Sequence, residues 1–166
     1  SGKTTFLRSV GLNLILAYAG APAAAVSLSV SPMTMFTSMR VEDNVSEGIS
    51  TFYAELLRIK GMVEFSQKGI PMLCLIDEIF KGTNSADRIV GATETIRRLS
   101  VPHGIILVST HDFELCNLET DSSVKALNFH FSEHYTDDGI QFDYKMSPGR
   151  CRTTNAQYLL KMAGIL

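Results

Sequence analysis

The sequence is poor in cysteine and has no large excess of charge of either sign. Its three cysteines, Cys74, Cys116 and Cys151, are too few and too scattered for a disulfide framework or a zinc site. Fifteen lysines and arginines stand against 17 acidic residues, which gives a formal net charge of -2. Domains that hold nucleic acid by electrostatics normally carry a basic face, so this balance argues against such a role for this chain alone.

Long apolar runs are also lacking. No run reaches the roughly 18 residues that a membrane-spanning helix needs, and no signal-peptide pattern is visible. The default expectation is therefore a cytoplasmic protein without a membrane segment in this chain. There are no internal repeats or low-complexity linkers, and 166 residues with 45% hydrophobic content suffice for a core. We expect residues 1–166 to form a single domain.

The most informative pattern is an unbroken apolar run from Met72 to Ile76, followed directly by Asp77 and Glu78. Because the run does not alternate, it predicts a central strand of a parallel sheet that is buried on both faces. Open α/β sheets bind ligands outside the carboxyl ends of their strands, where these two acids would lie. Two acids in an ordinary strand-to-helix loop are the alternative.

A second buried strand is predicted from Ile105 to Thr110, and it also ends in polar residues. His111 follows this strand and would face the same rim as Asp77 and Glu78 if the two strands are parallel. A contact between His111 and a γ-phosphate is then one interpretation. A histidine in a surface loop is the other.

The N-terminal residues resemble the second half of a phosphate-binding loop, G-x-x-x-x-G-K-[ST]. In such a loop backbone N–H groups bind phosphate oxygens, Lys3 would reach the β- and γ-phosphates, and the Thr4 hydroxyl would ligate Mg²⁺. The nucleotide-binding set is then Ser1, Gly2, Lys3, Thr4 and Thr5. The loop's first glycine would precede Ser1, so we expect a piece of a longer protein that binds ATP poorly alone. A lysine and a threonine in a frayed terminus are the alternative.

The two patterns together are more specific than either one. In a P-loop enzyme the first acid after the central strand binds Mg²⁺, usually through water, and the next acid orients and deprotonates the attacking water. These roles fall on Asp77 and Glu78 respectively. With Lys3 and Thr4 far upstream, the combination predicts hydrolysis of a nucleotide with Mg²⁺.

Three helices are predicted from apolar residues at helical spacing: Thr4 to about Ala19, Ser50 to about Gln67, and Asn84 to Leu99. The apolar face expected for the first helix comprises Phe6, Val10, Leu14 and Ala17.

Several polar residues stand where helix caps are expected. Ser50 is either an N-cap or a phosphate clamp for a neighbouring subunit, and the local sequence does not separate the two. Asn84 and Asp87 have the spacing of a capping box, so Asp87 has a good structural explanation. Asp112 is expected to cap a short helix over Phe113–Leu118.

Shorter segments complete an α/β pattern. Val26 to Val30 and Met33 to Met39 are predicted as short strands. Val124–Tyr135 and Ile140–Met146 alternate in polarity around Asp137-Asp138-Gly139, which predicts an antiparallel hairpin added at a sheet edge.

Taken together, these pieces resemble the ATPase domain of the MutS DNA mismatch-repair family, in the ABC class of P-loop ATPases. The matching segments, in chain order, are Ser1–Thr5, Asp43-Asn44 with Gly48–Phe52, Asp77–Ile79 with Gly82-Thr83, Thr110–Leu115, and Ala163–Ile165. The resemblance implies an ABC-type P-loop NTPase fold, with a mostly parallel central sheet and helices on both faces. It also implies that Asp77 is the Mg²⁺ acid, Glu78 the catalytic base and His111 the γ-phosphate sensor.

The resemblance further implies a composite site in a dimer. Two such domains, from a homodimer or with a second MutS-like subunit, would face each other. Nucleotide on Lys3 and Thr4 of one would be closed over by Ser50 of the other, acting in trans. Asn84 and Asp87 would lie at the dimer seam, and DNA would be bound by domains outside this chain.

The sequence departs from the family pattern at three positions. The family usually has Gly-Arg after Asp-Glu-Ile, where this chain has Phe80-Lys81, and Gly after the loop aspartate, where it has Arg88. Lysine keeps the charge of arginine but loses its planar bidentate fork, so a contact made there is in doubt. We therefore expect a divergent member of the family.

Two other classes are alternatives. A transporter-type ABC ATPase would couple the same chemistry to a membrane protein, but such proteins carry a longer helical insertion and a glycine-rich signature. A non-hydrolysing nucleotide-binding or scaffold module is the other, and intact Lys3, Thr4, Asp77 and Glu78 speak against it.

Overall fold

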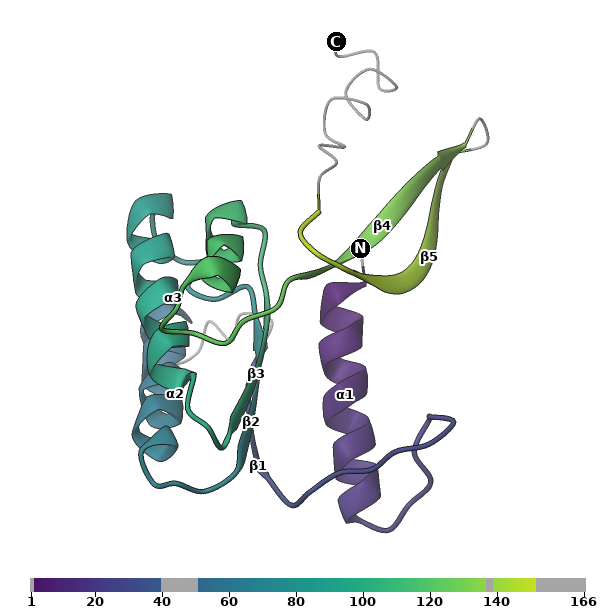
Figure 1. The fold of residues 1–166 in the computed structure, drawn as a ribbon, viewed down its shortest axis with the longest axis horizontal. Helices are drawn as coiled ribbons and strands as arrows, with labels where there is room; N and C mark the ends of the chain where they lie inside the picture. The colour runs from purple at the N-terminus through teal and green to yellow at the C-terminus, as the bar shows by residue number, and fades with distance from the viewer. Residues whose placement is uncertain (1, 40–50, 137–138, 152–166) are drawn as a thin grey trace. The chain divides into compact units, whose positions relative to one another are not determined.

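A computed structural model describes residues 2–39, 51–136 and 139–151 (Figure 1). The chain divides into two compact units, one formed by residues 2–126 and the other by residues that follow Ala126. No helix within the described ranges is both long and apolar enough to cross a membrane. The first unit contains the sheet and the residues predicted to carry the chemistry.

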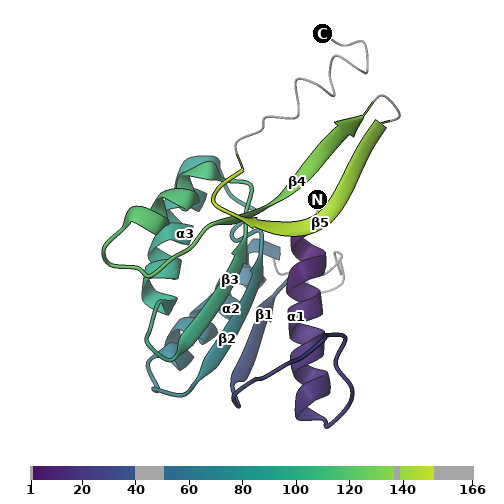
Figure 2. The ribbon, with the colours of Figure 1, turned by 45° about the vertical axis from the view of Figure 1, so that its right-hand side comes forward.

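The sheet of the first unit has three parallel strands, β1 (Thr34–Ser38), β2 (Met72–Asp77) and β3 (Gly104–Ser109). Their order is β1-β2-β3, so the strand that ends in the two acids is central (Figure 2). Because β2 and β3 run in the same direction, Asp77 lies beside Ser109 in the register. The predicted parallel sheet is confirmed, and its strands end at a common rim.

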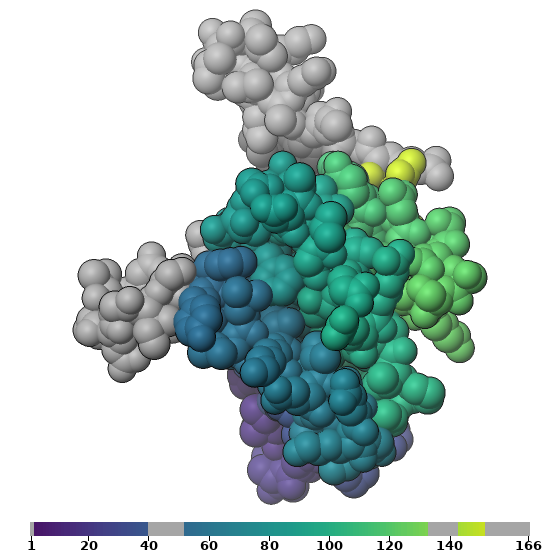
Figure 3. Space-filling view, turned by 90° about the vertical axis from the view of Figure 1, so that its left-hand side faces the viewer, coloured from purple at the N-terminus to yellow at the C-terminus, as the bar shows by residue number. Residues whose placement is uncertain are grey.

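Helices cover both faces of this sheet, as predicted. The helix α1 (Lys3–Tyr18) lies on one face, and α2 (Thr51–Ser66) and α3 (Ser85–Leu99) lie on the other (Figure 1). The outer surfaces of α2 and α3 form the face seen in Figure 3. A short 3-10 helix, η2 (Phe113–Thr120), packs against α3.

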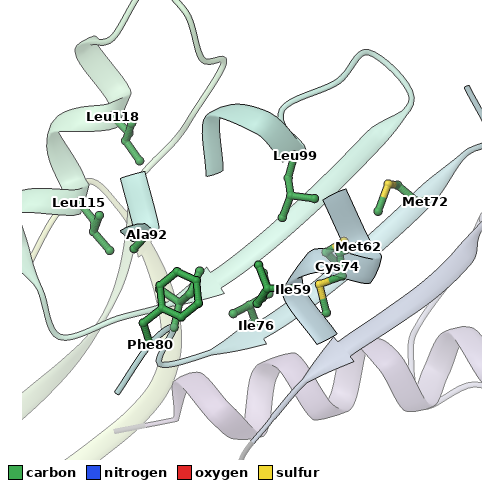
Figure 4. Packing of buried hydrophobic residues seen from close by; sticks show 11 residues of the cluster. Ile59, Met62, Met72, Cys74, Ile76, Phe80, Ala92, Leu99, Leu115 and Leu118 are labelled. Carbon is green, nitrogen blue, oxygen red and sulfur yellow. The ribbon is translucent and has the colours of Figure 1, made fainter. Parts of the chain in front are cut away.

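The core forms on both sides of β2, because this strand is apolar at every position before Asp77. Its residues from Met72 to Ile76 are at most 3% exposed. The larger cluster, on the side of α2 and α3, is drawn in Figure 4. Its buried members are Ile59, Met62, Met72, Cys74, Ile76, Ile79, Phe80, Ala92, Leu99, Leu115 and Leu118. Burial raises the pKa of the Cys74 thiol to about 12, which leaves it protonated at neutral pH.

The buried face of α1 differs in part from the predicted one. Its buried residues are Leu7, Gly11 and Leu14, whereas Phe6 and Val10 are only half-buried. A Cβ atom at Gly11 would lie 2.9 Å from Cδ1 of Leu75, so glycine allows α1 to approach the sheet closely. The prediction from apolar side chains missed Gly11, because at this position the backbone of α1 packs against the sheet.

The strand predicted over Val26–Val30 is wrong, since this segment has no regular structure. Side chains of α1, rather than a neighbouring strand, bind the connection between α1 and β1. The Tyr18 hydroxyl donates to the Ser31 carbonyl at 2.7 Å and accepts from the Met33 N–H at 2.9 Å. The Ala24 N–H donates to the Asn13 side chain at 2.6 Å.

The second unit contains the predicted antiparallel hairpin, β4 (Phe129–Thr136) and β5 (Gly139–Pro148). Among the residues that the structure describes, these strands pair only with each other, in a two-stranded sheet of their own. The register shifts between Phe131 and Glu133, which marks a bulge. The expected start at Val124 is too early, because the chain turns there, with the Val124 N–H bonded to the Asp121 carbonyl at 3.1 Å.

Candidate functional site

Three elements of the first unit meet at Asp77, the last residue of β2. The Thr4 hydroxyl, in the first turn of α1, donates to Oδ2 of Asp77 at 2.8 Å. The Ser109 hydroxyl, at the end of β3, donates to Oδ1 of the same carboxylate. The fold therefore brings together Thr4 and Asp77, which are 73 positions apart.

The donor set at this point suits a hard divalent cation. A hydroxyl oxygen and a carboxylate oxygen lie side by side, and Mg²⁺ prefers oxygen ligands. Within the described ranges there is no group of three or more histidine, cysteine, aspartate or glutamate residues that could hold a metal. Mg²⁺ typically takes one or two protein ligands and completes its shell with water and phosphate oxygens, so Thr4 and Asp77 fit that ion.

The helix α1 begins beside this pair. Lys3 is its first residue, and Gly2 precedes it with a φ of 102°, a left-handed conformation that favours glycine. Among the described residues no side chain caps this N-terminus, and the Gly2 carbonyl accepts the Phe6 N–H at 2.9 Å as the first bond of the helix. The first N–H groups of a helix carry partial positive charge and bind anions. Lys3 and Gly2 thus lie at a helix end suited to a phosphate chain.

Glu78 leaves the sheet in a left-handed conformation, with a φ of 55°. Its N–H donates to the Ser109 carbonyl at 3.0 Å, which continues the pairing with β3 by one residue. Its side chain meets two basic residues. Nε2 of His111 lies 3.1 Å from Oε1, and the Lys81 ammonium donates to Oε2.

These contacts keep Glu78 ionised. The hydrogen bond from Lys81 is the main reason that the pKa of Glu78 is lower than its usual 4.5, and partial burial opposes it. The charges of Lys81 and His111 lower the pKa further, whereas the nearby charge of Asp77 raises it. Both carboxylate oxygens of Glu78 therefore have a basic partner.

The loop that carries His111 is tied to α3 by an ion pair. Arg88 donates from Nε and Nη2 to the two oxygens of Asp112, at 2.8 and 2.6 Å. The prediction that the Asp112 side chain caps the following helix is wrong, because this fork occupies the carboxylate and no cap bond forms. Arg88 also lowers the pKa of Asp112. The Asp112 N–H donates to the Thr110 hydroxyl at 2.9 Å, which tightens the same loop.

Asn84 and Asp87 form the predicted cap at the start of α3. The Asn84 side chain accepts the Asp87 N–H at 2.9 Å, and its amide donates to the Asp87 carboxylate. Both side chains thus have a local structural role. Of the other predicted site residues, Thr5 is exposed in α1, and Ser1 and Ser50 lie outside the described residues.

Two residues that contribute to the site, Ser109 and Glu55, were not predicted from the sequence. Ser109 binds Asp77, and its signal was the polar residue at the end of the second apolar strand. Glu55 of α2 accepts the N–H of Phe80, two residues after Glu78, at 2.7 Å. No sequence pattern links Glu55 to Phe80, because their contact depends on how α2 packs against the end of β2.

The comparisons with known proteins agree on one family. MutS domain V matches the chain over residues 1–165. DNA mismatch repair protein MutS of Natronomonas pharaonis is 29% identical over 99% of this chain and 19% of that protein. MutS 2 of Halobacterium salinarum and MutS of Aquifex pyrophilus are each 30% identical over the same shares. The chain spans about a fifth of the length of the curated relatives it matches.

Replacing Lys81 by methionine is expected to raise the pKa of Glu78. The substitution removes the hydrogen bond and the charge that lower this pKa, and it leaves burial and Asp77, which raise it. Carbon-13 NMR titration of the Glu78 carboxyl measures the change. Lys60→Met, which removes an exposed lysine paired with Glu64 on α2, is the control.

The lowered pKa of Glu78 also determines how this residue affects the stability of the fold at different pH values. A carboxyl whose folded pKa is depressed stabilises the fold above its unfolded pKa, and that contribution is lost as the pH falls through the folded pKa. Lys81→Met should therefore lose this contribution, whereas Lys60→Met should not. An unchanged Glu78 titration in Lys81→Met would contradict the assigned role of Lys81.

Proposed function

This chain belongs to the MutS family as its domain V, the ATPase domain of DNA mismatch repair proteins, and on that premise we propose that it binds ATP with Mg²⁺ and hydrolyses it to ADP and phosphate. The proposed domain comprises residues 1–166. Its location is cytoplasmic.

The observation that carries this proposal is the 2.8 Å hydrogen bond between Thr4 and Asp77. The two residues come from separate motifs, the phosphate-binding loop and the acidic end of β2. A hydroxyl and a carboxylate in contact at the start of a helix, with Lys3 beside them, match what a P-loop enzyme needs for Mg²⁺ and phosphate. An ordinary pair of loop acids would not require a partner from the N-terminal helix.

In this proposal each side chain has a separate role. Lys3 and the N–H groups at the start of α1 bind the β- and γ-phosphates, and Thr4 and Asp77 hold Mg²⁺, which neutralises developing charge on the phosphates. Glu78 orients the attacking water and accepts its proton. His111, whose Nε2 lies 3.1 Å from Oε1 of Glu78, binds the γ-phosphate.

The complete site requires a second subunit. ATP bound at Lys3 and Thr4 is closed over by Ser50 of a partner domain, in a homodimer or with a second MutS-like subunit, and Asn84 and Asp87 lie at the seam. ATP binding clamps the two domains together, and hydrolysis releases them. This cycle drives DNA binding by domains outside the chain. The family match and the exposed position of Asn84 and Asp87 support this arrangement.

Glu78→Gln tests the hydrolytic role in the full-length protein. The variant should bind ATP with near-normal affinity and form a stable ATP-bound dimer, but its turnover should fall by about 100-fold or more, as expected for loss of a general base. Phosphate release and size-exclusion chromatography with ATP measure the two effects. Glu94→Gln, an exposed residue of α3, should behave as the unaltered protein. Turnover by Glu78→Gln at the normal rate would contradict the assignment.

Mixed dimers test whether Ser50 acts in trans. Ser50→Ala subunits are combined with Lys3→Ala subunits, and neither type forms a working site with its own kind. One of the two composite sites in a mixed dimer then has both residues intact, so turnover should recover to no more than half of the normal value. Recovery of both sites, or no recovery at any mixing ratio, would contradict action in trans.

A further inference from the structure

The turn that follows β2 contains two residues in the left-handed region that are not glycine. Glu78 has a φ of 55° and Phe80 a φ of 57°. This conformation is strained for residues with a side chain, most of all for a bulky one, and it persists only where the surroundings hold it. The turn therefore needs contacts that fix it, and it carries the acid proposed to activate water.

The side chain of Phe80 supplies one such contact. Its ring is buried in the core, with 5% of the residue exposed (Figure 4). It meets the edge of the Phe52 ring, with centroids 6.2 Å apart, and it packs on Gly91, where an added Cβ would lie 3.3 Å from the ring. These contacts hold the ring, whereas the peptide group before Phe80 is bound by a side chain of α2.

Glu55 fixes that peptide group. Its Oε1 accepts the Phe80 N–H at 2.7 Å, across 25 positions of sequence. Burial raises the pKa of Glu55 above its usual 4.5, and the bond from Phe80 opposes that rise. Partial burial of a carboxylate is unfavourable unless hydrogen bonds compensate for it, and this backbone bond provides such compensation.

We infer that Glu55 is a positioning residue for Glu78. By accepting the Phe80 N–H, its carboxylate holds the left-handed turn in the orientation in which Glu78 meets His111 and Lys81. This inference rests on the proposed role of Glu78 as the base. It adds a residue of α2 to a site otherwise built from α1, β2 and β3.

Because residue 80 is phenylalanine, its left-handed backbone needs a contact such as the hydrogen bond to Glu55. Glycine adopts a positive φ without strain, whereas phenylalanine does not. Phe80 gains burial against α2 and Gly91, and Glu55 offsets the strain of its backbone. Replacing Phe80 by glycine should therefore remove the need for Glu55, although the domain loses a buried ring.

The test measures ATP turnover and thermal unfolding of the full-length protein. Glu55→Ala should lower kcat by about tenfold, as expected for loss of one hydrogen bond to a charged group, with little change in KM. Glu55→Gln keeps an acceptor oxygen and should retain most of the activity. Glu64→Ala, an exposed residue of the same helix, is the matched control. If Glu55→Ala does not fold, Glu55→Asp, which withdraws the acceptor by one methylene, should show the same loss of kcat.

The double variant Glu55→Ala/Phe80→Gly gives the decisive readout. It should recover at least half of the kcat lost in Glu55→Ala while it unfolds at a lower temperature, because the buried ring is gone. A purely structural role of Glu55 predicts the opposite, since activity would then fall with stability. Normal kcat in Glu55→Ala, or no recovery in the double variant, would overturn the inference.

Failure of the proposed function would look different. It would appear as no ATP turnover by the unaltered protein, or as turnover that Glu78→Gln leaves intact. Hydrogen exchange at the Phe80 amide tests the contact without any turnover. Exchange should accelerate by about tenfold or more in Glu55→Ala, and an unchanged rate would overturn the role of Glu55.

Discussion

The backbone turn at the end of β2 is the constraint on which the site depends. A strand buried on both faces delivers Asp77 and Glu78 to the rim of the sheet, and the chain then bends through left-handed residues at Glu78 and Phe80. The Ser109 carbonyl and the Glu55 carboxylate bind the two N–H groups of this bend. The helix α2 follows Ser50 in the sequence and binds the turn of Glu78 through Glu55. If Ser50 acts in trans as proposed, the same helix therefore follows the residue that closes the partner's site and holds the turn of its own subunit.

The three departures from the family pattern all contact this region. Phe80 anchors the turn in the core, Lys81 binds the Glu78 carboxylate, and Arg88 holds Asp112 beside His111. Arg88 forms a bidentate pair that is partly shielded from solvent, so it orders the His111 loop more than an exposed pair would. In this region Glu78 is ionised, and Lys81 and His111 contact its two carboxylate oxygens.

Local sequence was enough to predict the main elements but not their long-range contacts. The apolar runs of β2 and β3, and the helical spacing of α2 and α3, reflect burial, which the residue pattern records directly. Asp112 was wrongly predicted as a cap, because an arginine on another helix competes for its carboxylate. The predicted strand at Val26–Val30 is wrong: the segment has no regular structure, and side chains of α1 bind the backbone on either side of it, at Ala24, Ser31 and Met33. Glu55 was missed because its partner is a backbone N–H, which has no residue signature.

We propose that Thr4 and Asp77 together hold the metal of a metal–ATP complex. The most direct measurement is Mn²⁺ binding by electron paramagnetic resonance, with Mn²⁺ in place of Mg²⁺ in the full-length protein. Mn²⁺ should bind tightly only when ATP is present, and Thr4→Val and Asp77→Asn should each weaken that binding by about tenfold or more, as expected for loss of a ligand group. Unchanged Mn²⁺ affinity in both variants would contradict the account.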